Sequence, residues 1–74
     1  MAKLSLNHAK KELGQKLREV REARGLSQEA LAEKSNISRT HISYIEIGAT
    51  APSLKFLIAL AEALEIDVRD LIPF

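Results

Sequence analysis

The sequence predicts an all-α fold, and three observations support that prediction. Apolar residues recur every three to four positions along the chain, which is the period of one helix face. The alternation of β-branched residues that is typical of strands is missing. Serine, asparagine, glycine and proline divide the chain into five helical segments. We therefore expect one five-helix domain over residues 1–74.

The first expected helix begins after Ser5 or Asn7, either of which is a favourable N-cap. Its apolar residues keep a helical period as far as Val20. Gly25 supplies the positive φ that ends many helices, and it stands directly after Arg24.

The second expected helix is short and begins at the N-cap Ser27. Glu29 lies in its first turn, where the helix dipole favours a negative charge. The helix ends near Lys34 or Ser35, and Asn36 then tolerates the left-handed backbone that a tight turn requires.

The third and fourth expected helices follow the same rules. Ser38 caps the third helix, which ends at Gly48, and Ser53 caps the fourth. Apolar residues cover more of the fourth helix than one core contact explains, which implies a second buried face.

A short fifth segment, Val68 to Ile72, completes the expected fold. Asp67 is its N-cap, and Pro73 prevents its continuation. Apolar side chains of this segment and of the fourth helix predict a homodimer interface, which consists of Phe56, Val68, Leu71, Ile72 and Phe74. The alternative is a monomer that uses all of them in its own core.

Composition narrows the classes of protein to which the chain can belong. Cysteine is absent and histidine occurs only twice, so we expect neither disulfides nor a structural zinc site, and no cofactor. The longest apolar run, residues 56–61, is far shorter than the roughly 20 residues of a membrane span. No apolar segment typical of a secretory signal occurs near the N-terminus, so a cytoplasmic location is expected.

Charge is unevenly distributed along the chain. Seven basic and three acidic residues precede Gly25, whereas four basic and seven acidic residues follow Arg24. This asymmetry indicates a polyanion contact on one side of the molecule, with an ordinary solvated helix face as the alternative.

The turn between the second and third helices has the features of a helix-turn-helix. Two short helices can cross steeply over a tight turn only where the contact residue is small, and Ala32 meets that need. Ile42 and Ile45 form the apolar side of the third helix. The polar residues left on its outer face form one stripe, which consists of Arg39, Thr40, Ser43 and Tyr44. Such a stripe suits the major groove of DNA, which admits one α-helix, although a merely solvated face is the plainer alternative.

Motifs along most of the chain resemble those of the Cro and phage-repressor (XRE) family of helix-turn-helix proteins. The residues that carry the resemblance are Leu13-Gly14, Arg21, Gly25-Leu26-Ser27-Gln28, Leu31-Ala32, Ile42-Ser43, Ile45-Glu46, Gly48, Pro52-Ser53-Leu54, Leu60-Ala61 and Leu64. Within the family, residues 39–43 are most similar to the recognition helix of restriction-modification controller proteins, which are small dimeric regulators.

The resemblance implies a role for several polar residues. Arg39, Thr40, Ser43 and Tyr44 would contact bases, with Arg39 the candidate for a bidentate contact to guanine. The residues that would contact phosphates are Gln28, Ser38 and His41. Arg21 and Glu46 would form a structural pair that ties the first helix to the third. The loop 48–52 departs from the family pattern because it carries no basic residue.

These observations predict a dimeric transcription regulator that reads a palindromic operator in double-stranded DNA. The main alternative is an antitoxin of the same fold with a toxin protein as its partner, which the uncharged loop and the apolar C-terminal face would suit. A third is the N-terminal domain of a longer phage-type repressor, which would need a linker after residue 74. An enzyme is not expected, because the sequence has no cysteine, no glycine-rich phosphate loop and no suitable carboxylate–histidine set.

Overall fold

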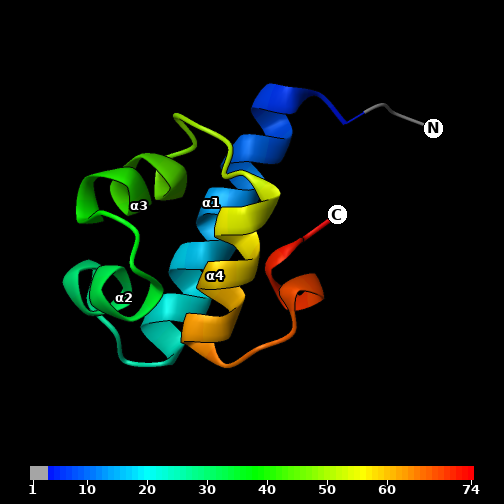
Figure 1. The fold of residues 1–74 in the computed structure, drawn as a ribbon. Helices are drawn as coiled ribbons and strands as arrows, with labels where there is room; N and C mark the ends of the chain where they lie inside the picture. The colour runs from blue at the N-terminus through cyan, green and yellow to red at the C-terminus, as the bar shows by residue number, and fades with distance from the viewer. Residues whose placement is uncertain (1–3) are drawn as a thin grey trace.

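Four α-helices and one 3-10 helix make up residues 4–74, the part of the chain that the computed structural model describes (Figure 1). The elements are α1 (Leu6–Ala23), α2 (Gln28–Ser35), α3 (Arg39–Glu46), α4 (Leu54–Leu64) and the 3-10 helix η1 (Val68–Leu71). The all-α prediction is therefore confirmed for these residues, but the last of the five expected segments is not an α-helix. Residues 1–3, which the single-domain prediction includes, lie outside the described part.

Serine side chains determine where the four α-helices begin. In each helix the serine hydroxyl oxygen accepts a hydrogen bond of 3.0–3.1 Å from the backbone N–H three residues further on. These N-caps are Ser5, Ser27, Ser38 and Ser53. Asp67 caps η1 by accepting from the backbone N–H of Arg69 at 2.9 Å. The caps agree with the sequence-based expectations, and Asn7 lies inside α1.

Left-handed residues other than glycine end two of the helices. Asn36 has a φ of 59° between α2 and α3, as expected for a residue that tolerates this geometry. Glu65 ends α4 with a φ of 58°, which the sequence did not predict, because glutamate rarely adopts this conformation.

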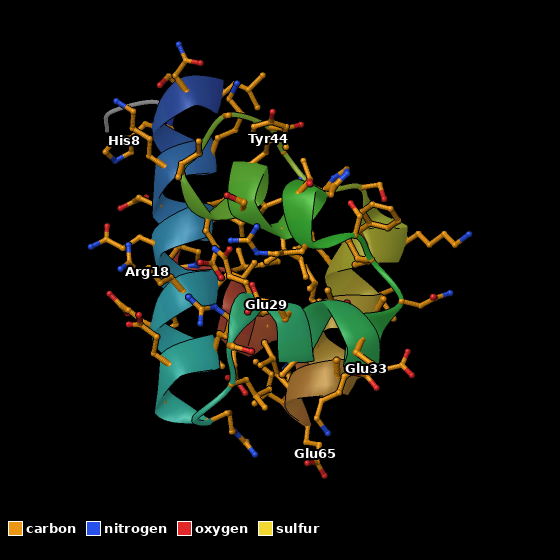
Figure 2. The ribbon with its side chains drawn as sticks, turned by 90° about the vertical axis from the view of Figure 1, so that its left-hand side faces the viewer. His8, Arg18, Glu29, Glu33, Tyr44 and Glu65 are labelled. Carbon is orange, nitrogen blue, oxygen red and sulfur yellow. The ribbon has the colours of Figure 1, made fainter. Side chains whose placement is uncertain are left out.

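The core lies among all five elements. α3 packs on α1, α2 packs on α4, and η1 contacts both α1 and α4. Figures 1 and 2 show α2 and α3 together on one side of the molecule, between α1 and α4, with η1 on the opposite side. The buried core cluster consists of Leu17, Leu31, Ile37, Ile42, Ile45, Leu60, Ala61, Leu64 and Leu71. In the described part of the chain, no helix has the length and apolar character needed to cross a membrane.

A close backbone contact orients α3 against α1. Gly14, in α1, faces the carbonyl oxygens of Ile45 and Glu46 at the end of α3. A Cβ atom at position 14 would lie 2.7 Å from the Glu46 oxygen and nearer still to that of Ile45, which is shorter than real Cβ contacts. The two helices can therefore approach this closely only because residue 14 has no side chain.

The expected dimer face needs correction. Leu71 is 1% exposed and belongs to the core of this chain, so it does not lie on a free surface. The helical spacing of Leu71 indicated that its side chain is buried, but spacing does not distinguish burial in the core of the chain from burial in a subunit interface. Phe56 and Val68 are partly buried against the same core, whereas Ile72 and Phe74 are exposed.

Candidate DNA-binding site

The outer face of α3 carries the polar stripe. Arg39, Thr40 and Tyr44 are exposed and Ser43 is half-buried. On the opposite side of the helix, Ile42 and Ile45 are almost completely buried in the core. In Figure 2, which looks onto α2 and α3, Tyr44 lies at the upper edge of α3. The structure therefore brings all four expected base-contacting residues to one accessible helix.

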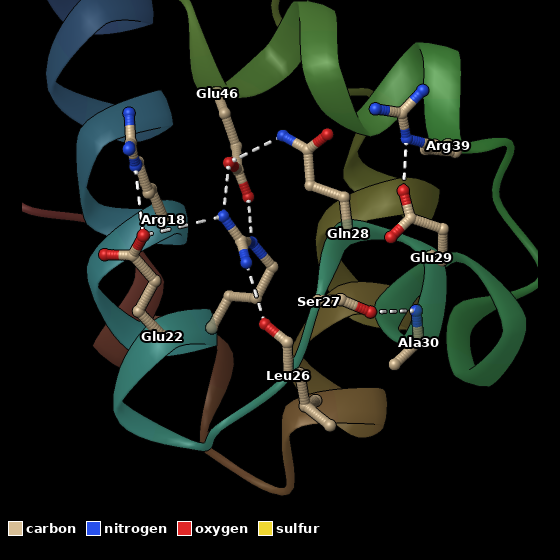
Figure 3. A network of polar contacts seen from close by, with 10 residues as sticks. Arg18, Glu22, Leu26, Ser27, Gln28, Glu29, Ala30, Arg39 and Glu46 are labelled. Carbon is tan, nitrogen blue, oxygen red and sulfur yellow. Dashed lines mark hydrogen bonds and ion pairs between the residues drawn. The ribbon is translucent and has the colours of Figure 1, made fainter.

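A buried ion pair holds this helix in place (Figure 3). Arg21 of α1 donates from Nε to Glu46 Oε2 at 2.7 Å and from Nη2 to Glu46 Oε1 at 3.1 Å. Its Nη1 donates to the carbonyl oxygen of Leu26 at 2.7 Å, in the segment that leads into α2. Arg21 thereby joins α1, the start of α2 and the end of α3.

Burial makes this ion pair sensitive to the loss of either partner. The side chains of Arg21 and Glu46 are 10% and 3% exposed. The hydrogen bond to Glu46 raises the pKa of Arg21 above its ordinary value, although burial by itself would lower it. Arg21 therefore remains charged, and removing Glu46 would leave that charge without its partner.

Gln28 also contacts this pair. Its Nε2 donates to Glu46 Oε1 at 3.0 Å, so the amide of the expected phosphate-contacting residue points to the buried carboxylate (Figure 3). The second N–H of that amide and its carbonyl oxygen are not used in this bond. The contact holds the first turn of α2 against the last turn of α3.

The other two expected phosphate-contacting residues lie at the start of α3. The Ser38 hydroxyl accepts from the backbone N–H of His41 at 3.1 Å, which leaves its own O–H free to donate. The His41 ring is half-buried and packs edge-on against Phe56 of α4, with 4.8 Å between ring centroids. His41 thus has a packing role that the sequence did not indicate.

A further contact involves the base-reading candidate Arg39. Its Nε lies 2.5 Å from Oε1 of Glu29, in the first turn of α2 (Figure 3). From the sequence we expected Glu29 to interact only with the helix dipole, because a contact across the turn depends on how α2 and α3 cross.

One lysine lies beside the uncharged loop that follows α3. A Cβ atom on Gly48 would lie 3.0 Å from Cγ of Lys11, which is an exposed residue of α1. A positive side chain from α1 therefore lies next to a loop that has no basic residue of its own.

The chain is similar to known helix-turn-helix proteins. A family model described as "Helix-turn-helix" (HTH_3) matches residues 17–71. The immunity repressor protein of Bacillus phage phi105 is 42% identical over 60 residues, which cover 81% of this chain and 42% of the repressor. The control protein C.BamHI of Bacillus amyloliquefaciens is 39% identical over 62 residues, which cover 82% of this chain and 76% of that protein.

A solved structure extends the similarity to the fold. The restriction-modification controller protein C.AhdI from Aeromonas hydrophila superposes with a TM-score of 0.84 at 43% identity, over 85% of this chain and 96% of that one. None of these three proteins is named as an antitoxin, so they lend no support to a toxin partner.

Length differs among the relatives. The chain spans 28% of one curated relative, a regulator from Sinorhizobium fredii, and 42% of the phage repressor. The family model nevertheless matches most of the chain, including both helices of the helix-turn-helix. The chain belongs to the HTH_3 (XRE-type) helix-turn-helix family.

Proposed function

We propose that this chain is a sequence-specific DNA-binding regulator of transcription, with residues 1–74 as a single domain, that inserts α3 into the major groove. The observation that carries the proposal is the exposed polar stripe on a helix that the buried Arg21–Glu46 pair fixes in orientation. A rigid helix with donors on its outer face is what direct reading of base edges requires. The bound protein would regulate transcription through the place where it binds, by controlling access to a promoter.

Roles within the site follow from the chemistry of each side chain. Arg39 would donate two N–H groups to the O6 and N7 of a guanine, and Thr40 would contact a thymine methyl or a phosphate. Ser43 and Tyr44 would contact neighbouring base edges. The residues proposed to contact phosphate remain Gln28, Ser38 and His41, which lie in the first turns of α2 and α3 or directly before them.

We further propose that the regulator is a homodimer that reads a palindrome. The side chains that support this proposal are exposed apolar residues of α4 and the C-terminal segment, namely Leu54, Ile58, Ile72 and Phe74. Leu54 and Ile58 are one helical turn apart and share a face. A two-fold dimer would present two copies of α3 to half-sites about 34 Å apart, one turn of DNA.

Selection from random DNA tests this proposal directly. The full chain is incubated with random duplexes at near-physiological salt, and the retained sequences are determined. We expect enrichment of a palindrome with half-sites about one turn apart. The matched control is a variant with Arg39→Ala and Ser43→Ala, which removes two polar side chains of the stripe and keeps the core. A folded wild-type protein that enriches no sequence, or one that enriches the same sequence as this variant, would contradict base reading by α3.

A further inference from the structure

The contact between Glu29 and Arg39 joins the two helices of the helix-turn-helix at their first turns. We infer that Glu29 is a positioning residue that makes Arg39 selective for guanine. The inference rests on the proposed function, because it concerns how α3 distinguishes bases. It goes beyond that function by assigning part of the specificity to a residue of α2 that does not itself read a base.

The first reason for this positioning role is the nitrogen of Arg39 that Glu29 contacts. Glu29 Oε1 lies against Nε of Arg39, and the two terminal nitrogens, Nη1 and Nη2, donate no hydrogen bond within residues 4–74. A guanine presents two acceptors on its major-groove edge, O6 and N7, and arginine satisfies both with a pair of N–H groups. A carboxylate on Nε therefore holds the guanidinium plane and leaves the Nη1–Nη2 edge free for the base.

The second reason is that the turn of α2 that carries Glu29 is itself held in place. The neighbouring residue, Gln28, donates to Glu46 of α3 at 3.0 Å, and Ser27 caps the same turn. The backbone that carries Glu29 is thus tied to the helix that carries Arg39. Glu29 therefore holds Arg39 from a fixed point rather than from a mobile loop.

Exposure determines when the contact matters. Both side chains are more than 60% exposed in the free protein, so water weakens the pair and it contributes little to folding. In the major groove, bases and backbone displace much of that water, and the same charges interact more strongly. A free arginine can also contact any phosphate it reaches, and such contacts carry no sequence information. By holding Arg39, Glu29 reduces these alternative contacts.

Binding titrations with the selected operator test the inference. The base pair that Arg39 reads is the one whose preference Arg39→Ala abolishes, and all four bases are compared there. For Glu29→Gln, we expect the preference for guanine to fall by about 3- to 10-fold, a part of what one bidentate contact supplies. Binding to unrelated duplexes should strengthen, and the melting temperature should stay at the wild-type value. An unchanged guanine preference would overturn the inference.

Two comparisons separate positioning from other effects of the substitution. Glu33→Gln, on the exposed side of α2, removes the same charge from a residue with no ion pair in the described chain, and it should leave the guanine preference unchanged. In the Arg39→Ala background, Glu29→Gln should have no effect on base preference. An effect that persists there would mean that Glu29 contacts a base itself, and an equal effect of Glu33→Gln would reduce the role of Glu29 to net charge. Either result would overturn positioning through Arg39.

The failure of this inference is distinguishable from the failure of the proposed function. If the wild-type protein selects no sequence, the proposed function is overturned and the inference with it. If the wild-type protein selects an operator and Glu29→Gln reads it with the same preference at every position, only the role of Glu29 is overturned.

Discussion

Arg21 and Glu46 lie 25 residues apart in the sequence and meet in a two-point ion pair between α1 and α3. Glu46 is the last residue of α3, so the pair fixes the end of the helix whose outer face carries the polar stripe. Gln28 and the carbonyl of Leu26 join the same network from the side of α2. The orientation of both helices of the helix-turn-helix thus depends on one buried carboxylate.

Replacement of that carboxylate should destabilise the fold. Glu46→Ala leaves the buried Arg21 guanidinium with its hydrogen bond to the Leu26 carbonyl and a 3.9 Å contact to the exposed Glu22, and loss of one partner of a buried pair typically costs about 3–5 kcal/mol. Urea unfolding should show the midpoint falling accordingly. Glu19→Ala is the matched control, because Glu19 is exposed on α1 and has no ion pair within residues 4–74, so this substitution should change the free energy of unfolding by no more than about 0.5 kcal/mol. Equal midpoints for the two variants would contradict a structural role for the Arg21–Glu46 pair.

The local features of the fold were predictable, because each depends on a few adjacent residues. A serine at an N-cap accepts a hydrogen bond from the backbone N–H three residues further on, as Ser27 does. An asparagine in a tight turn tolerates a left-handed conformation, as Asn36 does. By contrast, Glu65 occupies a left-handed position for which glutamate gives no local signal.

The features that depend on packing were not predictable from spacing. The contact of Glu29 with Arg39 exists only because α2 and α3 cross where they do. Leu71 has the periodicity of a buried residue, but periodicity does not distinguish a residue of the core from one of a subunit interface. The resemblance to the XRE family supplied the Arg21–Glu46 pairing, which no local pattern would have indicated.

The close contact between Gly14 and α3 predicts that Gly14→Ala lowers the stability of the protein, although the same substitution usually stabilises a helix. A glycine in the middle of a helix normally costs about 1 kcal/mol relative to alanine, so Gly14→Ala would be stabilising in an isolated helix. Here the added methyl group meets two carbonyl oxygens of α3, and overpacking typically costs about 1–3 kcal/mol. We expect net destabilisation in thermal unfolding, whereas the control Gln15→Ala, at an exposed position of α1, should stay within about 0.5 kcal/mol of wild type. A more stable Gly14→Ala variant would show that α1 and α3 are not in backbone contact.

The left-handed end of α4 offers a stabilising substitution. Glu65 has a φ of 58°, and its negative charge lies at the C-terminus of a helix, where the dipole disfavours it. Glu65→Gly removes both penalties and should raise the free energy of unfolding by about 1 kcal/mol, measured by urea titration. Glu62→Gly removes the same side chain from inside α4 and should lower it by about 1 kcal/mol. If both glycines destabilise the protein, Glu65 is not left-handed in solution.

Lys11 should contribute a phosphate contact that the loop after α3 cannot. It lies beside Gly48 at the end of α3, and each phosphate contact adds about 0.9 to the slope of log affinity against log salt concentration. Lys11→Ala should therefore lower that slope by about 0.9 and weaken binding similarly for operator and unrelated DNA. Arg69→Ala, on η1 at the opposite side of the fold from α2 and α3, should leave the slope unchanged. A wild-type slope for Lys11→Ala would place this side chain away from the DNA.

The exposed apolar residues of α4 should mediate dimerisation. Ile58 is 44% exposed and shares a face with Leu54, so a charge there would be buried in any interface that this face forms. In sedimentation equilibrium at micromolar concentration, we expect a wild-type dimer and an Ile58→Glu monomer with an unchanged helical spectrum. Gln15→Glu, at an exposed position of α1, controls for added negative charge and should remain dimeric. Because two linked copies of α3 bind one palindrome, Ile58→Glu should also lose most of its operator affinity while keeping its affinity for unrelated DNA. A wild-type protein that sediments as a monomer would contradict the dimer, and an Ile58→Glu dimer would place the interface elsewhere.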